Sequence, residues 1–178
     1  MTGRFFYTAS FTDICTNFFM SYRIGYGIDF HQLQEGREFW LGGVLIPHTK
    51  GAVGHSDADV LLHAICDALL GALCLGDIGQ HFPNTDETLK GIDSKILLRK
   101  TFALIQAKGY KVVNIDSTIC LENPKIMKYA HEMQKVIAFI LNIGLDDISI
   151  KATTTEKLGF AGREEGVFAQ ATLLLSKK

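Results

Sequence analysis

An aspartate and two histidines have residue types and a spacing that suit a metal site. Asp29 and His31 are two positions apart in a β-type run, so both side chains would point to the same face of a strand. His63 lies in an apolar stretch that predicts a mostly buried helix, where an imidazole without a hydrogen-bond partner or a metal is costly. Catalytic zinc typically has three protein ligands and one open position. The pattern leaves two interpretations open, a zinc site or ordinary core and surface histidines.

A second polar cluster directly follows a predicted strand, at a place where α/β proteins tend to bind ligands. It consists of Thr153, Thr154, Thr155, Glu156 and Lys157. Hydroxyl groups suit phosphate oxygens, but Glu156 would repel a phosphate unless a cation lay between them, and Mg²⁺ commonly bridges carboxylates and phosphates. A solvated polar turn with a capping threonine explains the same residues.

His55 and Ser56 stand where the long apolar helix is expected to begin. Ser56 followed three residues later by Asp59 resembles a capping box, so we expect the helix to run from about Asp57 to about Leu75. Backbone N–H groups at this end of the helix would suit an anion, although the negative charges of Asp57 and Asp59 would partly offset their field. As a helix cap alone, Ser56 needs no further function.

The elements that must position these residues alternate between strands and helices. We expect five strands, over residues 22–31, 39–46, 112–121, 148–153 and 167–175, the first two close enough for a hairpin. Two further helices are expected. One runs from Asp93 or Ser94 to Lys108, and the other runs from Pro124, which would lie in its first turn, to Asn142. A long loop over 76–91 is a candidate lid.

This order predicts an α/β fold, a two-layer sandwich in which a mixed β-sheet has helices on one face. The other face of the sheet still needs cover, and several copies that pack their sheets together would provide it. We therefore expect a homo-oligomer.

Composition and charge exclude several classes of protein. The chain has 178 residues, of which 47% are hydrophobic, and its formal net charge is −1. It contains no Lys/Arg-rich tract and no apolar run of transmembrane length, so neither nucleic acid nor a membrane is an expected partner. Its four cysteines lack Cys-x-x-Cys spacing, which favours reduced core cysteines in a reducing compartment.

The first residues differ from the rest of the chain. Residues 1–20 lack the basic start and long apolar core of a secretory signal. We expect residues 1–21 to be an N-terminal extension and residues 22–178 to be a single domain. A bacterial cytoplasmic location is expected, with a short plastid-type address as the weaker alternative.

Five stretches of the sequence carry a further signal. They are Gly-Ile-Asp29-Phe-His31, His55-Ser-Asp-Ala-Asp-Val-Leu-Leu-His63, Gly-Asp77-Ile-Gly79, Phe82-Pro-Asn-Thr-Asp86 and Lys151-Ala-Thr-Thr-Thr-Glu156-Lys-Leu-Gly-Phe160. In this order they closely resemble the 2-C-methyl-D-erythritol 2,4-cyclodiphosphate synthase family, over about residues 22–176.

The resemblance implies a phosphorus–oxygen lyase of the non-mevalonate isoprenoid pathway. In that family, 4-diphosphocytidyl-2-C-methyl-D-erythritol 2-phosphate is cyclised: the 2-phosphate attacks the β-phosphorus and CMP leaves. Two alternatives stay open, a zinc phosphoesterase and a non-catalytic trimeric protein that binds prenyl diphosphates.

The resemblance also implies ligands and roles. Asp29, His31 and His63 would hold one zinc ion per subunit, and Glu156 would hold Mg²⁺ or Mn²⁺ on the substrate diphosphate. His55 and Thr154 would be the catalytic contacts to phosphate groups. Further substrate-binding residues would be Ser56, Asp77, Ile78, Gly79, Phe82, Asn84, Asp86, Thr153 and Thr155, with Leu121, Pro124, Lys125, Ile126, Met127 and Ala152 in a slot for cytosine.

In that family the cytosine slot comes from the neighbouring subunit of a homotrimer, so the active sites lie between subunits. Phe160 and Arg163 match residues that line the central cavity of the trimer, which would take an isoprenoid diphosphate; an intersubunit salt bridge is the alternative for Arg163. Asn84 departs from the family, which usually has aspartate there, but an amide can still contact a hydroxyl because it both donates and accepts.

Overall fold

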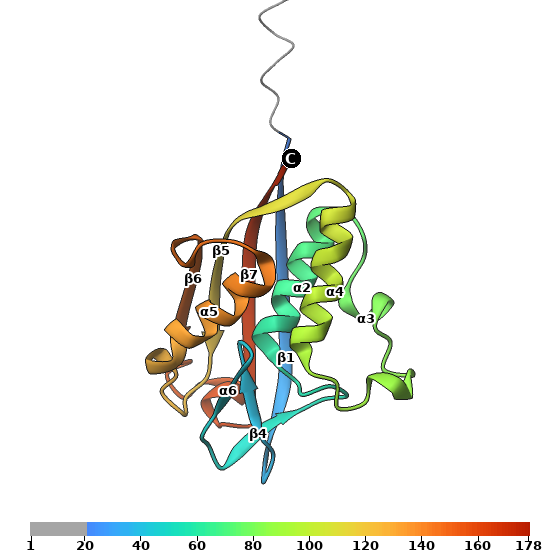
Figure 1. Cartoon of the computed structure of the whole chain (residues 1–178). Helices are drawn as coiled ribbons and strands as arrows, with labels where there is room; N and C mark the ends of the chain where they lie inside the picture. The colour runs from blue at the N-terminus through green and yellow to red at the C-terminus, as the bar shows by residue number, and fades with distance from the viewer. Residues whose placement is uncertain (1–20) are drawn as a thin grey trace, which may run out of the picture.

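The protein is built on one mixed sheet with its main helices on one side (Figure 1). The computed structural model describes residues 21–178. The strand order is β4-β1-β7-β5-β6, in which only the β5–β6 pair is parallel. The strands are β1 (Tyr22–Glu35), β4 (Lys50–Val53), β5 (Tyr110–Cys120), β6 (Ile148–Thr153) and β7 (Gly166–Lys177). The predicted mixed sheet is therefore confirmed.

The remaining elements connect these strands or cover them. A separate two-stranded sheet is formed by β2 (Phe39–Leu41) and β3 (Val44–Ile46). The main helices are α2 (Val60–Ala72), α4 (Ser94–Ala107) and α5 (Ala130–Leu141). Short helical turns are α3 (Ile78–His81), η1 (Glu87–Leu89), η2 (Met127–Tyr129), η3 (Leu145–Asp147) and α6 (Gly159–Gly162).

The predicted strand over 39–46 is wrong, as is its hairpin with β1. Gly42 and Gly43 both have positive φ, which glycine adopts freely, and they fold this stretch back on itself as the β2–β3 hairpin. A missed strand, β4, pairs with the end of β1 instead, from Gln32 to Glu35. Because β4 has only four residues, two of them alanine and glycine, its sequence carried little strand signal.

The predicted start of the long helix is also wrong. Ala58 has a φ of 56°, which interrupts any helix that began at Asp57, and α2 begins at Val60. Asp59 is the N-cap, since its carboxylate accepts from the backbone N–H of Leu62 at 3.0 Å. The hydroxyl of Ser56 is thereby released from a capping role.

The segment after β5 differs from the prediction as well. Pro124 follows a cis peptide bond and does not begin a helix; η2 intervenes, and α5 starts only at Ala130. Asn123 instead donates from its side chain to the Glu164 carboxylate at 2.8 Å, which ties this turn to the segment before β7. By contrast, the helix capped by Asp93 is confirmed as α4.

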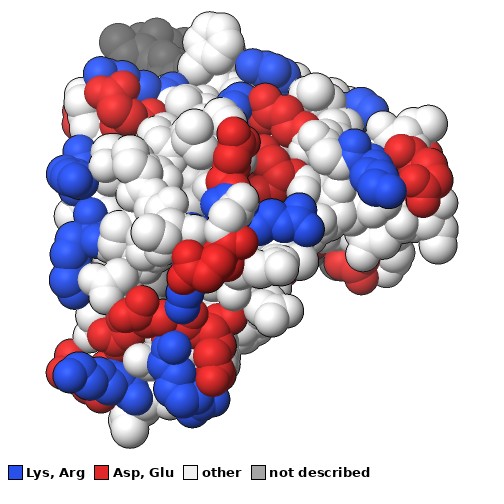
Figure 2. Space-filling model, turned by 90° about the horizontal axis from the view of Figure 1, so that it is seen from below, with Lys and Arg blue, Asp and Glu red and all other residues white. Residues whose placement is uncertain are grey.

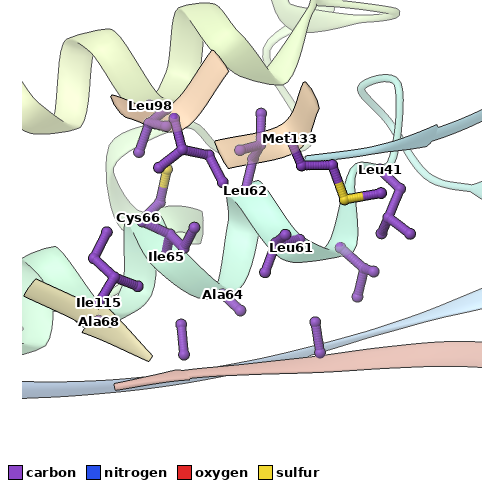
Figure 3. Packing of buried hydrophobic residues seen from close by; sticks show 14 of the residues in the cluster. Leu41, Leu61, Leu62, Ala64, Ile65, Cys66, Ala68, Leu98, Ile115 and Met133 are labelled. Atoms are coloured by element: carbon purple, nitrogen blue, oxygen red, sulfur yellow. The ribbon is translucent and has the colours of Figure 1, made fainter. Parts of the chain in front are cut away.

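Helix α2 lies directly on the backbone of β1. A Cβ atom at Gly25 would lie 1.8 Å from the carbonyl oxygen of Ala68, and one at Gly27 would lie 2.1 Å from that of Ala64. Figure 3 shows Ala64 and Ala68 on the side of α2 that faces the strands, while larger residues fill the space toward α4 and α5. Small residues on both partners therefore set the distance between helix and strand.

The opposite face of β1 carries large apolar side chains. Ile24, Tyr26 and Phe30 alternate with the residues that face α2, and all three are exposed. Cover of this face by other copies of the chain stays a prediction.

Two expectations fall partly on residues that are not described. The expected extension over 1–21 lies, except for Ser21, outside the described residues, as does Cys15. In the described part, Cys66, Cys74 and Cys120 are free, and Cys74 is exposed rather than in the core because it follows the end of α2. Between residues 21 and 178, no helix is long and apolar enough to cross a membrane.

We expect Gly27→Ala to lower the free energy of unfolding by about 1–3 kcal/mol, because the added methyl group cannot fit against the Ala64 carbonyl. Gly71→Ala is the matched control: its Cβ would meet only the carbonyl oxygen of Tyr26 at 3.8 Å, so it should raise stability by roughly 0.5–1 kcal/mol. Chemical denaturation measures both. Equal stability of the two variants would contradict the close packing of α2 on β1.

Candidate functional site

Three predicted metal ligands meet between β1 and α2. Oδ2 of Asp29 lies 2.9 Å from Nδ1 of His63 and 3.0 Å from Nε2 of His31, and the two nitrogens lie 3.0 Å apart. Asp29 and His31 come from alternate positions of β1, as predicted, and His63 comes from the first turns of α2. One ligand atom from each residue lies within 4.8 Å of the others.

The outward nitrogens of the two imidazoles also have partners. Nδ1 of His31 lies 3.0 Å from the carbonyl oxygen of Val53, which can only accept, so Nδ1 carries a hydrogen, and with a cation in the cluster Nε2 would offer it a lone pair. Nε2 of His63 lies 2.9 Å from the hydroxyl of Ser94. A carboxylate oxygen and imidazole lone pairs aimed at one point are the donor set of a catalytic zinc site. The residues present therefore fit a zinc ion.

The pKa values of the ligands are shifted in opposite directions. Burial alone would raise the pKa of Asp29, but hydrogen bonds with His31 and His63 hold it well below its usual value. Burial alone would lower the pKa of His63, but its hydrogen bond to Asp29 raises it. The site thus stabilises a carboxylate together with a neighbouring positive charge, which a divalent cation can supply.

A cavity of about 350 Å³ opens in front of this cluster. Nine predicted site residues line it: Asp29, His31, His55, Ser56, His63, Ile78, Gly79, Phe82 and Asn84. The sequence did not indicate the other lining residues, which are Val53, Gly54, Leu89, Ile92 and Leu97. Their mostly apolar side chains follow no motif, and they come from separate segments: Val53 ends β4, Leu89 belongs to the loop over 76–91 and Leu97 belongs to α4.

His55 connects the helix entrance to that loop. Its Nε2 donates to the carbonyl oxygen of Asp86 at 3.1 Å, and its own carbonyl accepts from Gly91 N–H at 2.7 Å. The carboxylates of Asp77 and Asp86 cap α3 and η1 respectively, and neither residue lines the cavity. These two predicted substrate contacts are therefore not brought to the cavity in a single chain.

A second cavity, of about 280 Å³, contains the whole predicted cytosine slot. It is lined by Leu121, Pro124, Lys125, Ile126, Met127 and Ala152, together with Thr153 and Thr154. Asp29 and Ala152 lie in one row across the sheet, through Ala169 and Ile119. Three strand spacings, or about 14 Å, separate Asp29 from Ala152 along that row.

The turn after β6 presents Thr154 and Glu156. The hydroxyl of Thr154 donates to Oε1 of Glu156 at 2.8 Å, and Glu156 is exposed, apart from the Asp29 cluster. Glu122, which no sequence motif indicated, shapes the turn: its Oε1 accepts from the N–H groups of Thr155 at 3.0 Å and Lys157 at 3.1 Å. These hydrogen bonds lower the pKa of Glu122, and the one from the Lys157 N–H has the largest effect.

Phe160 and Arg163 lie away from both cavities. Phe160 packs with Phe30 and Phe168, at ring-centroid distances of 6.0 Å to each. Arg163 forms a two-pronged ion pair with Glu165 of the same chain, at 2.9 and 2.8 Å. Within one chain, neither residue lines either of these two cavities.

Charges of both signs are mixed on the end of the molecule drawn in Figure 2, rather than gathered into one basic surface. This agrees with the net charge of −1. An anionic ligand must therefore be held by local groups, such as N–H donors and a metal, rather than by the field of the whole protein.

The profile of the YgbB family matches residues 22–176, nearly the whole described chain. The chain belongs to the YgbB family. It is 61% identical, over 158 residues, to the 2-C-methyl-D-erythritol 2,4-cyclodiphosphate synthase of Bacteroides fragilis strain YCH46, which covers 89% of this chain and 99% of that protein. The enzyme of the same name from Acinetobacter baumannii strain SDF is 58% identical over 86% of this chain and 96% of its own.

Solved structures of this YgbB-family fold agree with these comparisons. A structure of 2C-methyl-D-erythritol-2,4-cyclodiphosphate synthase has a TM-score of 0.80 at 40% identity and covers 86% of this chain and 99% of its own. The CDP complex of IspF from Plasmodium falciparum has a TM-score of 0.79 at 36% identity, and it covers 90% of this chain and 99% of its own. The bifunctional IspDF of Campylobacter jejuni has a TM-score of 0.86 at 40% identity; this chain covers 43% of its length, and the match covers 89% of this chain.

We expect His63→Ala to weaken zinc affinity by more than about 100-fold, beyond the loss typical of residues that only support a ligand, because one of three ligands is removed. Competition with a chelator measures the affinity, and circular dichroism reports the fold. His131→Ala, which removes an exposed histidine of α5, is the matched control and should bind zinc normally. Full zinc affinity in the His63 variant would refute the metal site.

Proposed function

We propose that this YgbB-family chain converts 4-diphosphocytidyl-2-C-methyl-D-erythritol 2-phosphate to 2-C-methyl-D-erythritol 2,4-cyclodiphosphate and CMP, a step of isoprenoid biosynthesis. One observation carries the proposal: Asp29, His31 and His63 converge on the wall of a cavity that also contains His55 and Ser56. The names of the closely similar relatives agree with it.

The reaction is an intramolecular phosphoryl transfer. An oxygen of the 2-phosphate forms a bond to the β-phosphorus, the bond from that phosphorus to the bridging oxygen breaks, and the electron pair leaves with CMP. The chain contributes by holding the reacting phosphates in line and by neutralising their charge. A zinc ion on Asp29, His31 and His63 would polarise an oxygen of the β-phosphate.

The groups at the entrance of α2 would bind the 2-phosphate. Ser56 and His55 lie on the cavity wall beside the metal ligands. Because His55 is tied to the carbonyl of Asp86, the 84–91 segment positions it against this wall. The wall residues Ile78, Gly79, Phe82 and Asn84 would then surround the erythritol and ribose.

The turn after β6 would bind the diphosphate through a second metal. Glu156 offers one exposed carboxylate, and Mg²⁺ or Mn²⁺ typically takes one or two carboxylates and completes its shell with substrate phosphates and water. Thr154, and the neighbouring Thr153 and Thr155, would donate to phosphate oxygens. In the slot next to this turn, Leu121, Lys125 and Met127 would surround the cytosine.

A homotrimer would join the two cavities across subunit boundaries. The support is that the metal cluster and the cytosine slot lie three strands apart in one chain, while β1 exposes Ile24, Tyr26 and Phe30 on its outer face. Sheets packed together in a trimer would bury that face. Phe160 and Arg163 would then line a central cavity that takes an isoprenoid diphosphate. We also propose that residues 22–178 act as one domain in the bacterial cytoplasm.

Phosphorus NMR tests the activity. The protein is incubated with the cytidylated substrate, zinc and magnesium, and a cyclic diphosphate together with CMP is the expected product. Formation of an acyclic product with inorganic phosphate would instead identify a phosphoesterase, because activated water would then be the nucleophile. Unchanged substrate that is nevertheless bound would identify a binding protein.

Hybrid oligomers test the location of the active site. His63→Ala removes a metal ligand and Glu156→Gln disables the diphosphate side, so each variant alone should be inactive. If sites lie between subunits, a coexpressed equal mixture should regain activity at about a quarter of the sites, where both halves are intact. Asp29→Asn mixed with His63→Ala is the control and should regain none. A mixture as inactive as its parts would place the whole site in one subunit.

A further inference from the structure

One carboxylate oxygen holds the turn that presents Glu156. Oε1 of Glu122 accepts from the backbone N–H of Thr155 at 3.0 Å and from that of Lys157 at 3.1 Å. Backbone N–H groups can only donate, which sets the direction of both hydrogen bonds. The two N–H groups lie on either side of Glu156 in the chain, so Glu122 fixes the backbone before and after that residue.

The turn is poorly suited to its own sequence. The N–H of Leu158 donates to the carbonyl of Thr155 at 3.0 Å, which closes a four-residue turn. Its central residues, Glu156 and Lys157, have φ values of 52° and 64°. Positive φ at both central positions is the mark of a type I′ turn, which favours glycine and asparagine because a larger side chain is strained there. Glutamate and lysine at these positions therefore need support from outside the turn, and Glu122 supplies it.

The hydroxyl of Thr155 adds little to this support. It lies 2.6 Å from the carbonyl oxygen of Leu158 and 3.3 Å from Oε1 of Glu122. A hydroxyl has one hydrogen to donate, and the shorter contact takes it. The two backbone N–H groups are therefore the bonds that connect Glu122 to the turn.

Glu122 also belongs to the segment that forms the proposed cytosine slot. Leu121 and Pro124, on either side of it in the chain, line that slot together with Thr153 and Thr154. The N–H of Leu121 donates to the carbonyl of Thr153 at 3.1 Å, which joins the ends of β5 and β6, and the Glu122 carboxylate extends this connection into the turn. A base and a diphosphate are parts of one ligand, so the spacing between slot and turn must match that ligand.

We propose that Glu122 is a positioning residue that holds Thr154 and Glu156 at a fixed distance from the cytosine slot and so prepares the turn for a metal-bound diphosphate. The inference rests on the proposed function for its ligand, but the hold of Glu122 on the turn can be measured without any ligand. An amide oxygen accepts from N–H groups as a carboxylate does, so glutamine can take over a positioning role. It cannot supply a negative charge to a cation.

Three variants of the full chain separate these roles. Glu122→Ala removes the acceptor of both N–H groups, and Glu122→Gln keeps an acceptor without the charge. Glu132→Ala is the control, because it removes an exposed glutamate of α5 that pairs with Lys135. In metal-free protein, NMR should show the N–H groups of Thr155 and Lys157 exchanging hydrogen at least about tenfold faster in Glu122→Ala and at nearly the original rate in the other two variants.

Ligand binding gives the second measurement. Binding of CDP in the presence of Mn²⁺, measured by calorimetry, should weaken by about 10- to 100-fold in Glu122→Ala and by less than about threefold in Glu122→Gln and the control. Glycine adopts positive φ freely, so Glu122→Ala should weaken CDP binding less in a Lys157→Gly background than in the original sequence.

Three results would overturn the proposal. Equal loss of CDP binding in Glu122→Gln and Glu122→Ala would show that the charge of Glu122 matters rather than its hold on the turn. Unchanged CDP binding in Glu122→Ala, or unchanged hydrogen exchange in that variant, would show that the turn keeps its shape without Glu122. Should the unmodified protein bind no CDP, faster exchange in Glu122→Ala that is absent in Glu122→Gln would still support the hold on the turn, while the proposed function would fail.

Discussion

The close approach of α2 to β1 is the contact on which the site depends. Gly25 and Gly27 leave no side chain between strand and helix, so the carbonyls of Ala68 and Ala64 lie against the strand backbone. The next two inward positions of the same strand are Asp29 and His31. His63, one residue before Ala64, is thereby brought within hydrogen-bond distance of both. The spacing of Gly25 and Gly27 is thus a packing feature.

Two aspartate carboxylates hold the entrance of α2 in place. Asp59 is fully buried and accepts from the N–H groups of Gly42, Gly43 and Leu62, which joins the β2–β3 turn to the start of the helix. Burial raises its pKa, although the three N–H groups oppose this. Asp57 in turn joins this segment to α4. The chain between these aspartates must adopt an unusual backbone at Ala58, which leaves Ser56 facing the cavity.

Local patterns predicted the elements whose side chains alternate or repeat regularly. The strand 148–153 was predicted to the residue, and the spacing of Asp29 and His31 placed both on one face. Contacts between distant segments carried no local signal, so β4 and the cavity wall at Leu89 and Ile92 were missed. The resemblance to a family supplied the cytosine slot, which no pattern of charge or periodicity indicated. Glu122 could have been suspected only as a carboxylate just beyond a strand end.

The alternation of β1 connects the metal site to the expected assembly. Inward positions carry the two glycines and two metal ligands, while the outward positions carry Ile24, Tyr26 and Phe30. A shift of one residue in register would turn the ligands to the outer face and the aromatic rings toward α2. Continuous antiparallel pairing with β7, from Tyr22 opposite Ser176 to Gln32 opposite Gly166, fixes the register over the whole of this stretch. The same pairing therefore orients the ligands and presents the apolar face that a neighbouring subunit would cover.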